Sequence, residues 1–221
     1  YAMHVAERMV QEGDDPRSLG IRIAALGAEP HTEEMRVKLD ELYGFKAFNS
    51  YGLSEMNGPG VGFECECHDG MHTWEDSYLV EIIDPETRQP VPEGEIGELV
   101  LTTLRRTAHP IMRYRTRDLT RVVSGECPCG RKHVRIARFV GRSDDLLIIR
   151  GVNVFPSQLE EVIMRTDWLG GNYVLHLTTK QALDQMTVRV ELAQSGFDGS
   201  IETLRARRTE LMRQLREQVG F

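Results

Sequence analysis

The hydrophobic positions at the start of the chain change from a helical period to short unbroken runs. Over residues 2–12 apolar side chains recur every three or four positions and stop at Gly13, which predicts a helix. A second helix is predicted from Thr32, a good N-cap, to residue 43. The apolar run 21–26 predicts a buried strand, and the run 45–49 predicts the next strand. Ligands bind at the loops that follow strands in open α/β sheets, so both strand ends are expected to build one pocket.

From about residue 61 the pattern changes to short alternating runs separated by turn residues. Alternation with a period of two is typical of strands with one buried face. The strands expected here cover residues 78–83, 98–103, 118–123 and 134–140. They predict an antiparallel β subdomain, either a sheet or a distorted barrel, packed on the preceding α/β part.

A smaller unit is predicted after residue 144. Its expected elements are a strand (146–149), a helix (157–165), two strands (173–177 and 186–192) and a long amphipathic helix (200–218). The predicted fold class is therefore α/β with an appended antiparallel β subdomain, followed by a small α+β C-terminal domain. The expected domain ranges are 1–60, 61–143 and 144–221.

Composition narrows the classes of function. With 221 residues, of which 40% are hydrophobic and 28% charged, the chain can bury one large core or two small ones. The net charge of −7 argues against nucleic acid as a general partner, because binding to phosphates needs a cationic surface. No apolar run approaches the roughly 20 residues that span a bilayer, and the first residues show no signal-peptide pattern. We therefore expect a cytoplasmic protein with no membrane partner.

Three short segments carry the candidate chemistry. The first, Ser50-Tyr51-Gly52-Leu53-Ser54-Glu55, places an aromatic ring and a carboxylate at a strand end, where a purine can stack and Mg2+ can find an oxygen ligand. The second, Tyr114-Arg115-Thr116-Arg117-Asp118, holds a lone acid among arginines, suited to accept two hydrogen bonds from a ribose. The third, Gly141-Arg142-Ser143-Asp144-Asp145 followed by Arg150-Gly151-Val152-Asn153, indicates a link between two packed units.

In this combination and order the segments resemble the adenylate-forming acyl-CoA synthetases, and most closely the phenylacetate–CoA ligase branch. Further segments that resemble this branch extend the match from about residue 26 to about residue 165; they are 27–30, 55–60, 81–85, 94–100 and 150–158. The block Gly151-Val152-Asn153-Val154-Phe155-Pro156-Ser157 is the most branch-specific of them.

The resemblance implies an ATP-dependent, AMP-forming acid–CoA ligase, with phenylacetate as the first candidate substrate. A carboxylate would attack the α-phosphate of ATP and expel pyrophosphate, and CoA thiolate would then displace AMP from the acyl-adenylate. ATP or AMP, Mg2+ and coenzyme A would be bound. Glu55 is the candidate Mg2+ ligand and catalytic residue. Tyr51 and Gly52 would contact adenine, and Asp118 would hold the ribose, with Arg142 beside it or on the phosphate.

The resemblance also implies roles for residues at the edges of the site. Gly27, Ala28 and Glu29 would edge the adenine and acyl pockets, and Gly151 with Val152 would line the pantetheine tunnel. A side chain at position 151 would obstruct this narrow tunnel.

Asp144 is the expected hinge. In the family the small domain rotates between an adenylation pose and a thioester-forming pose. The pivot is the acidic residue two positions after an arginine, which is Arg142 in this chain. A short acid beside Ser143 can absorb the required change in φ and ψ. An ordinary turn with an aspartate cap is the alternative.

Two parts of the family are not found in this chain. Its enzymes are about twice as long, and they carry a Ser/Thr/Gly-rich phosphate loop before these motifs and a lysine loop near the C-terminus. Here Lys180 is the last lysine. We therefore expect the second half of such a ligase, inactive by itself.

The cysteines fall into two clusters: Cys65-Glu66-Cys67-His68, with His72 nearby, and Cys127-Pro128-Cys129-Gly130, with His133 nearby. Cytoplasmic disulfides are rare, whereas sulfur and nitrogen ligands from two loops suit a tetrahedral Zn2+. Buried free thiols are the alternative. The predicted zinc ligands are Cys65, His72, Cys127 and Cys129, with Cys67 or His68 as replacements for one of them.

Other functions remain open on the sequence alone. The substrate could instead be a hydroxyphenylacetate, indoleacetate, benzoate or short fatty acid. The chain could also be a non-catalytic nucleotide-binding module, or a structural piece whose arginine-rich helix at 200–218 meets a partner. The family further suggests a homodimer.

Overall fold

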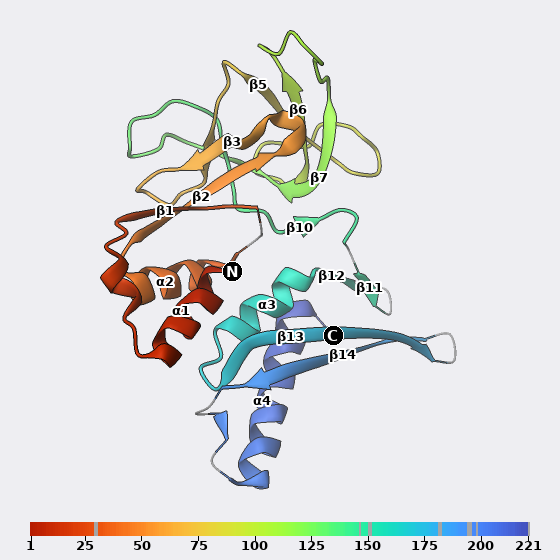
Figure 1. Ribbon diagram of the computed structural model, residues 1–221. Coiled ribbons are helices and arrows are strands. Elements are labelled where there is room, and N and C mark those ends of the chain that lie inside the picture. The colour runs from red at the N-terminus through yellow and green to blue at the C-terminus, as the bar shows by residue number, and fades with distance from the viewer. Residues whose placement is uncertain are drawn as a thin grey trace. The chain divides into compact units, whose positions relative to one another are not determined.

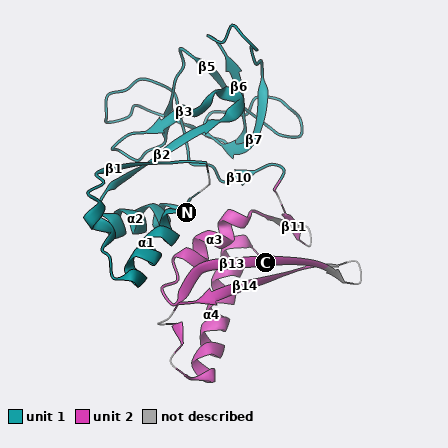
Figure 2. Cartoon of the chain, in the orientation of Figure 1, with its two compact units in different colours: residues 1–144 teal, residues 145–221 magenta. Residues whose placement is uncertain are grey.

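The chain divides into two compact units, residues 1–144 and 145–221 (Figure 2). The computed structural model describes residues 1–28, 31–145, 147–149, 152–180, 183–193, 196–197 and 199–220. The division falls beside Asp144, within one residue of the predicted start of the small domain.

Two helices open the first unit. α1 (Ala2–Glu12) and α2 (Glu33–Tyr43) each end at a glycine with left-handed φ, 88° at Gly13 and 72° at Gly44, where a side chain would be strained. Thr32 caps α2 as predicted, because its Oγ1 accepts a hydrogen bond of 3.2 Å from the backbone N–H of Met35. The two helices lie beside the first two strands (Figure 1). These elements share a small core, whose buried members are Ala6, Leu39, Tyr43, Phe45 and Ala47.

A six-stranded sheet runs through most of this unit in the order β1-β2-β3-β4-β9-β8. Its strands are β1 (Ile23–Leu26), β2 (Lys46–Leu53), β3 (Gly58–Glu64), β4 (Met71–Thr73), β8 (Val122–Val123) and β9 (Arg135–Ile136). β1 and β2 are parallel, and the other pairs are antiparallel. The sheet continues across the predicted division at residue 60 without a break.

The expectation of a buried first strand is wrong. β1 forms at the predicted place, but the side chain of Ile23 is 68% exposed. The physical reason is its position: β1 is the edge strand of the described sheet and pairs with β2 alone.

A four-stranded antiparallel sheet completes the first unit. Its order is β10-β7-β6-β5, formed by β5 (Tyr78–Ile83), β6 (Gly97–Thr103), β7 (Tyr114–Thr120) and β10 (Gly141–Arg142). The predicted strand 118–123 is divided between the end of β7, which begins at Tyr114 and ends at Thr120, and β8. The predicted strand 134–140 shrinks to β9. Side chains of both sheets pack into one core, which includes Met56, Val61, Met71, Leu99 and Leu101.

The second unit has the predicted order of elements and one additional strand. β11 (Leu147–Ile149) pairs with β12 (Val152–Val154), which the pattern did not predict. α3 (Pro156–Met164), β13 (Leu169–Lys180), β14 (Leu183–Leu192) and α4 (Ile201–Val219) follow, and the two long strands are antiparallel. Leu159, Ile163, Leu211 and Leu215 pack in their common core. None of the described helices is both long enough and apolar enough to cross a membrane.

Candidate nucleotide site

A cavity of about 280 Å³ lies in the first unit, beside the C-terminal ends of β1 and β2. Six of the residues singled out in the sequence line it: Gly27, Ala28, Tyr51, Gly52, Asp118 and Arg142. They come from the loop after β1, from β2, from β7 and from β10. The two strand ends therefore build one pocket, as their order along the chain predicted.

Two glycines allow the backbone to approach itself closely at this cavity. A Cβ on Gly27 would lie 2.5 Å from the carbonyl oxygen of Ser50, and a Cβ on Gly52 would lie 2.3 Å from that of Gly58. Neither position has room for a side chain. Ala28, the next residue of the first loop, has a φ of 71°, a left-handed conformation that costs energy for a non-glycine residue. Gly27 and Ala28 are thus held in a tight, strained backbone conformation.

Asp118 is the centre of the polar side of the cavity. The Tyr51 hydroxyl donates a hydrogen bond of 2.6 Å to its Oδ2, and the Arg142 guanidinium donates one of 3.1 Å to its Oδ1. Burial, together with the negative charge of Asp118, raises the pKa of the Tyr51 hydroxyl far above its ordinary value, so this group stays protonated and donates. Burial raises the pKa of Asp118, while the bonds from Tyr51 and Arg142 act against that rise.

The carboxylate of Asp118 keeps acceptor capacity toward the cavity. An ionised carboxylate can accept about four hydrogen bonds, and the two described bonds use one site on each oxygen. A ligand with two neighbouring hydroxyls can donate to the remaining sites. The ring of Tyr51 packs on Phe139, with centroids 4.4 Å apart and planes inclined by 40°, so its position is fixed.

Arg142 connects the cavity to the end of the first unit. Its Nε and Nη2 each donate a hydrogen bond of 2.9 Å to the two carboxylate oxygens of Asp144, in addition to the bond to Asp118. The guanidinium holds the pKa of Asp144 below its ordinary value. One arginine thus contacts both the candidate ribose ligand and the candidate hinge.

Glu55 lies beside the cavity and does not line it. It belongs to the short 3₁₀ helix η2 (Ser54–Met56) after β2 and is exposed. Its Oε1 accepts a hydrogen bond of 3.1 Å from the Tyr114 hydroxyl, and its carbonyl oxygen accepts one from Arg106. Tyr114 of β7 therefore orients the carboxylate, which remains open to solvent. A ligand of Mg2+ needs such exposure, because the bound ion keeps several water molecules.

Sequence reasoning missed a buried charged group behind the pocket wall. Glu64, whose side chain is inaccessible, accepts a hydrogen bond of 3.0 Å from the backbone N–H of Asn49 and one of 3.4 Å from Arg138. Burial alone raises the pKa of Glu64, but the bonds from Asn49 and His68 and the charge of Arg138 outweigh it and lower that pKa. Asn49 and Arg138 line the cavity, together with His31 and Phe139. These residues are far apart in the chain, so no local motif could identify them.

Comparisons with known proteins identify the relatives of this chain. A family model described as AMP-binding enzyme C-terminal domain matches residues 151–221. The phenylacetate-coenzyme A ligase of Thermus thermophilus is 42% identical, with 100% of this chain and 52% of that protein covered. That of Escherichia coli K12 is also 42% identical, with 99% and 49% covered. The chain belongs to the phenylacetate–CoA ligase family.

A solved structure of another CoA ligase has the same fold over the matched part. 2-Hydroxyisobutyryl-CoA ligase, in its postadenylation state with 2-HIB-AMP, is 31% identical with a TM-score of 0.92, and the match covers 100% of this chain and 47% of that one. The chain spans about half the length of the phenylacetate–CoA ligases that it matches.

The remaining predicted site residues lie elsewhere or outside the described part of the chain. Val152 lies on β12, where it packs against the core of the second unit. Glu29 and Gly151 are outside the described residues. The predicted zinc ligands do come together: Cys65, His72, Cys127 and Cys129 place their ligand atoms within 4.8 Å of one another.

Proposed function

We propose that this chain forms the nucleotide-binding part of an ATP-dependent acid–CoA ligase. In the first step a carboxylate attacks the α-phosphate of ATP and pyrophosphate leaves; in the second CoA thiolate attacks the acyl carbon and AMP leaves. The observation that carries the proposal is the position of Asp118, held between Tyr51 and Arg142 on the wall of a cavity. This arrangement suits the two ribose hydroxyls of a nucleotide.

The family resemblance implies the roles of the cavity residues, and their positions are compatible with these roles. Tyr51, packed on Phe139, lines the cavity and would stack on adenine, and Gly27 with Ala28 lines the same cavity and would edge the adenine. Arg142 neutralises Asp118 and lines the cavity, so it would contact a ribose or phosphate oxygen of the nucleotide. These groups position the nucleotide, which is the larger part of catalysis in a transfer of this type.

Glu55 is the proposed Mg2+ ligand. Its carboxylate is exposed and bonded to Tyr114 through one oxygen, so the donor set fits a hard cation that keeps several waters. A bound Mg2+ would neutralise charge on the departing pyrophosphate. Coenzyme A is the proposed second substrate, and Gly151 with Val152 remains the predicted wall of the pantetheine tunnel. The homodimer also stays a prediction.

Phenylacetate is the proposed acid. Three relatives named phenylacetate-coenzyme A ligase, from Thermus thermophilus, Pseudomonas putida and Escherichia coli, are 42–47% identical. The 31% identical relative named for 2-hydroxyisobutyrate shows that one fold of this type accepts acids of different shape. Substrate identity therefore needs a direct measurement.

Acid-dependent exchange of pyrophosphate into ATP tests the function. The full-length gene product should catalyse exchange with phenylacetate at a higher kcat/KM than with benzoate, indoleacetate or short fatty acids. Exchange led by another acid would keep the chemistry and overturn phenylacetate. If no acid supports exchange but AMP binds, the chain belongs to a nucleotide-binding module instead.

A further inference from the structure

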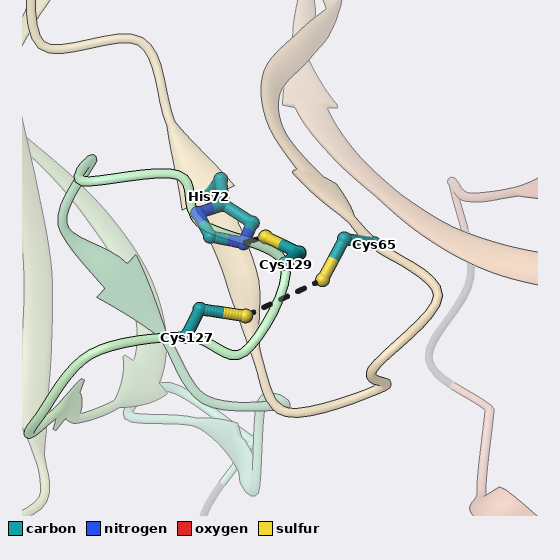
Figure 3. Close-up of side chains that lie close together, drawn as sticks. All are labelled: Cys65, His72, Cys127 and Cys129. Carbon is teal, nitrogen blue, oxygen red and sulfur yellow. Dashed lines mark hydrogen bonds between the residues drawn. The ribbon is translucent and has the colours of Figure 1, made fainter.

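Three cysteines and a histidine form a cluster that the nucleotide site does not use. Cys65 follows β3, His72 lies on β4, and Cys127 and Cys129 lie between β8 and β9. Figure 3 shows their side chains converging on one small volume from three separate segments. The three Sγ atoms and a ring nitrogen all lie within 4.8 Å of one another. Such convergence of soft ligands points to a metal ion.

The distances within the cluster match the edges of a zinc tetrahedron. The Sγ atoms of Cys65 and Cys127 are 3.6 Å apart, and Cys129 Sγ lies 3.4 Å from His72 Nε2. Bond lengths of about 2.3 Å to sulfur and 2.0–2.1 Å to nitrogen put two thiolates roughly 3.8 Å apart and a thiolate and an imidazole roughly 3.6 Å apart. We propose that Cys65, His72, Cys127 and Cys129 bind one Zn2+.

Burial indicates a structural site. Cys65, His72 and Cys127 are 6%, 2% and 5% exposed. Four protein ligands fill the coordination sphere of Zn2+, so no position is open for water or substrate. Three thiolates leave the site with one net negative charge, and the Arg131 guanidinium, which hydrogen-bonds Cys129, offsets it. The ion would join loops and take no part in acyl transfer.

The two Cys-x-Cys segments are built as the same turn. The backbone N–H of His68 donates to the carbonyl of Cys65 at 3.0 Å, and that of Gly130 donates to the carbonyl of Cys127 at 3.0 Å. Both donor residues have left-handed φ, 51° at His68 and 82° at Gly130. His68 is not a glycine, so its left-handed backbone conformation costs free energy. Metal binding by the turn would offset that free energy.

The geometry distinguishes the four proposed ligands from the two alternative ligands, His68 and Cys67. His68 is already engaged, because its Nδ1 lies 3.0 Å from Glu64 Oε2 and its ring stacks on Phe48 with centroids 5.3 Å apart. Cys67 is a neighbour of Cys65 and Cys127 but lies outside the set of mutually close ligand atoms. Cys67 is therefore the matched control for the ligand cysteines.

The site lies directly behind the pocket wall. Cys65 follows Glu64, which bonds Asn49 and Arg138, and His72 follows Met71, which lines the cavity. Neighbouring residues of a strand face opposite sides, so His72 points away from the cavity that Met71 faces. The ion would thus fix the connections after β3 and before β9 without entering the nucleotide pocket.

Metal analysis of the full-length gene product tests the proposal. Protein purified under reducing conditions, without chelator or metal-affinity tag, should contain about one zinc per chain. Well under one zinc per chain, with no uptake of added Zn2+, would overturn the site. Cys129→Ser should lower zinc affinity by at least about tenfold, because even the loss of a residue that only supports a metal ligand lowers the affinity about tenfold. Cys67→Ser should leave zinc affinity nearly unchanged. Equal loss in both variants would refute the ligand set.

Two measurements on the wild-type protein test the zinc site independently of variants, which can fail to fold. X-ray absorption at the zinc edge should show three sulfurs and one nitrogen, whereas four sulfurs would put Cys67 in place of His72 and contradict the assignment. After denaturation without reductant and with chelator, the 4 cysteines of this chain should all react as free thiols. A covalent link between Cys65 and Cys127 in that assay would replace the zinc proposal with a disulfide.

Discussion

At the scale of single residues, Tyr51 has two separable contributions to the nucleotide pocket. Its ring packs on Phe139 and faces the cavity, and its hydroxyl donates to Asp118 at 2.6 Å. Stacking uses the ring alone, whereas the orientation of Asp118 depends on the hydroxyl. Substitutions can remove one contribution and keep the other.

We expect Tyr51→Ala to weaken ATP binding by about 1–3 kcal/mol, the usual value of a base stacked on an aromatic side chain. Tyr51→Phe keeps the ring and should change the KM for ATP only a few-fold. Both variants are compared in acid-dependent pyrophosphate exchange, with the unfolding midpoint as the control for folding. A Phe variant as impaired as the Ala variant would show that the bond to Asp118, and not stacking, is the main contribution.

At the scale of elements, Glu98 holds neighbouring strands together at the end of the first unit. It lies on β6 with an inaccessible side chain, and Arg115 of β7 donates to it at 2.9 and 2.7 Å. The hydroxyl of Ser143, just before the candidate hinge, donates at 3.2 Å. Burial alone raises the pKa of Glu98, but the hydrogen bond and charge of Arg115 outweigh it and hold that pKa below its ordinary value.

Glu98→Gln should lower the free energy of unfolding by about 3 kcal/mol at pH 7, because it leaves Arg115 without its carboxylate. Since the pKa of Glu98 is lower in the folded state, its stabilisation is complete above the unfolded pKa of about 4.3 and is lost as the pH falls through the folded pKa. The difference between wild type and variant in urea unfolding should therefore shrink below about pH 4. Exposed Glu95→Gln is the control, and a difference independent of pH would contradict the ion pair.

At the scale of the whole molecule, the boundary between the two units is the candidate hinge. The division falls after Asp144, and Arg142 holds the Asp144 carboxylate while it also bonds Asp118. Loss of the charge and loss of backbone freedom at this residue are different perturbations. Asp144→Ala removes the charge alone, whereas Asp144→Pro removes both the charge and the backbone freedom, so the difference between the two variants reports the backbone.

We expect Asp144→Pro in the full-length gene product to retain pyrophosphate exchange and to lose thioester formation on the order of a hundredfold, because the second step needs a different placement of reacting groups. Asp144→Ala should keep both half-reactions within a few-fold. The two steps are measured separately, as pyrophosphate exchange and as acyl-CoA release from preformed acyl-adenylate. If proline impaired both steps equally, the hinge assignment would be wrong.

The elements that were predicted well are those with short-range causes. The period of residues 2–12, the cap at Thr32 and the alternation at 78–83 each involve neighbours along the chain, and α1, α2 and β5 form where these signals lie. The two-residue strand β10 was missed, because a pair of residues carries no period, whereas β8 and β9 lie inside predicted strands that were too long. The exposure of β1 was mispredicted for a related reason: apolar composition does not tell an edge strand from a central one.

By itself the sequence determined the family motifs, the local elements and the identity of the groups that could bind a nucleotide or a metal. Only the tertiary structure decided which of them meet. Tyr51 and Asp118 are 67 positions apart and share a hydrogen bond, and Cys65 approaches Cys127 across 62 positions while Cys67, its neighbour, lies outside the cluster. Strand register and packing set these encounters, and both depend on contacts between distant parts of the chain that no local pattern records.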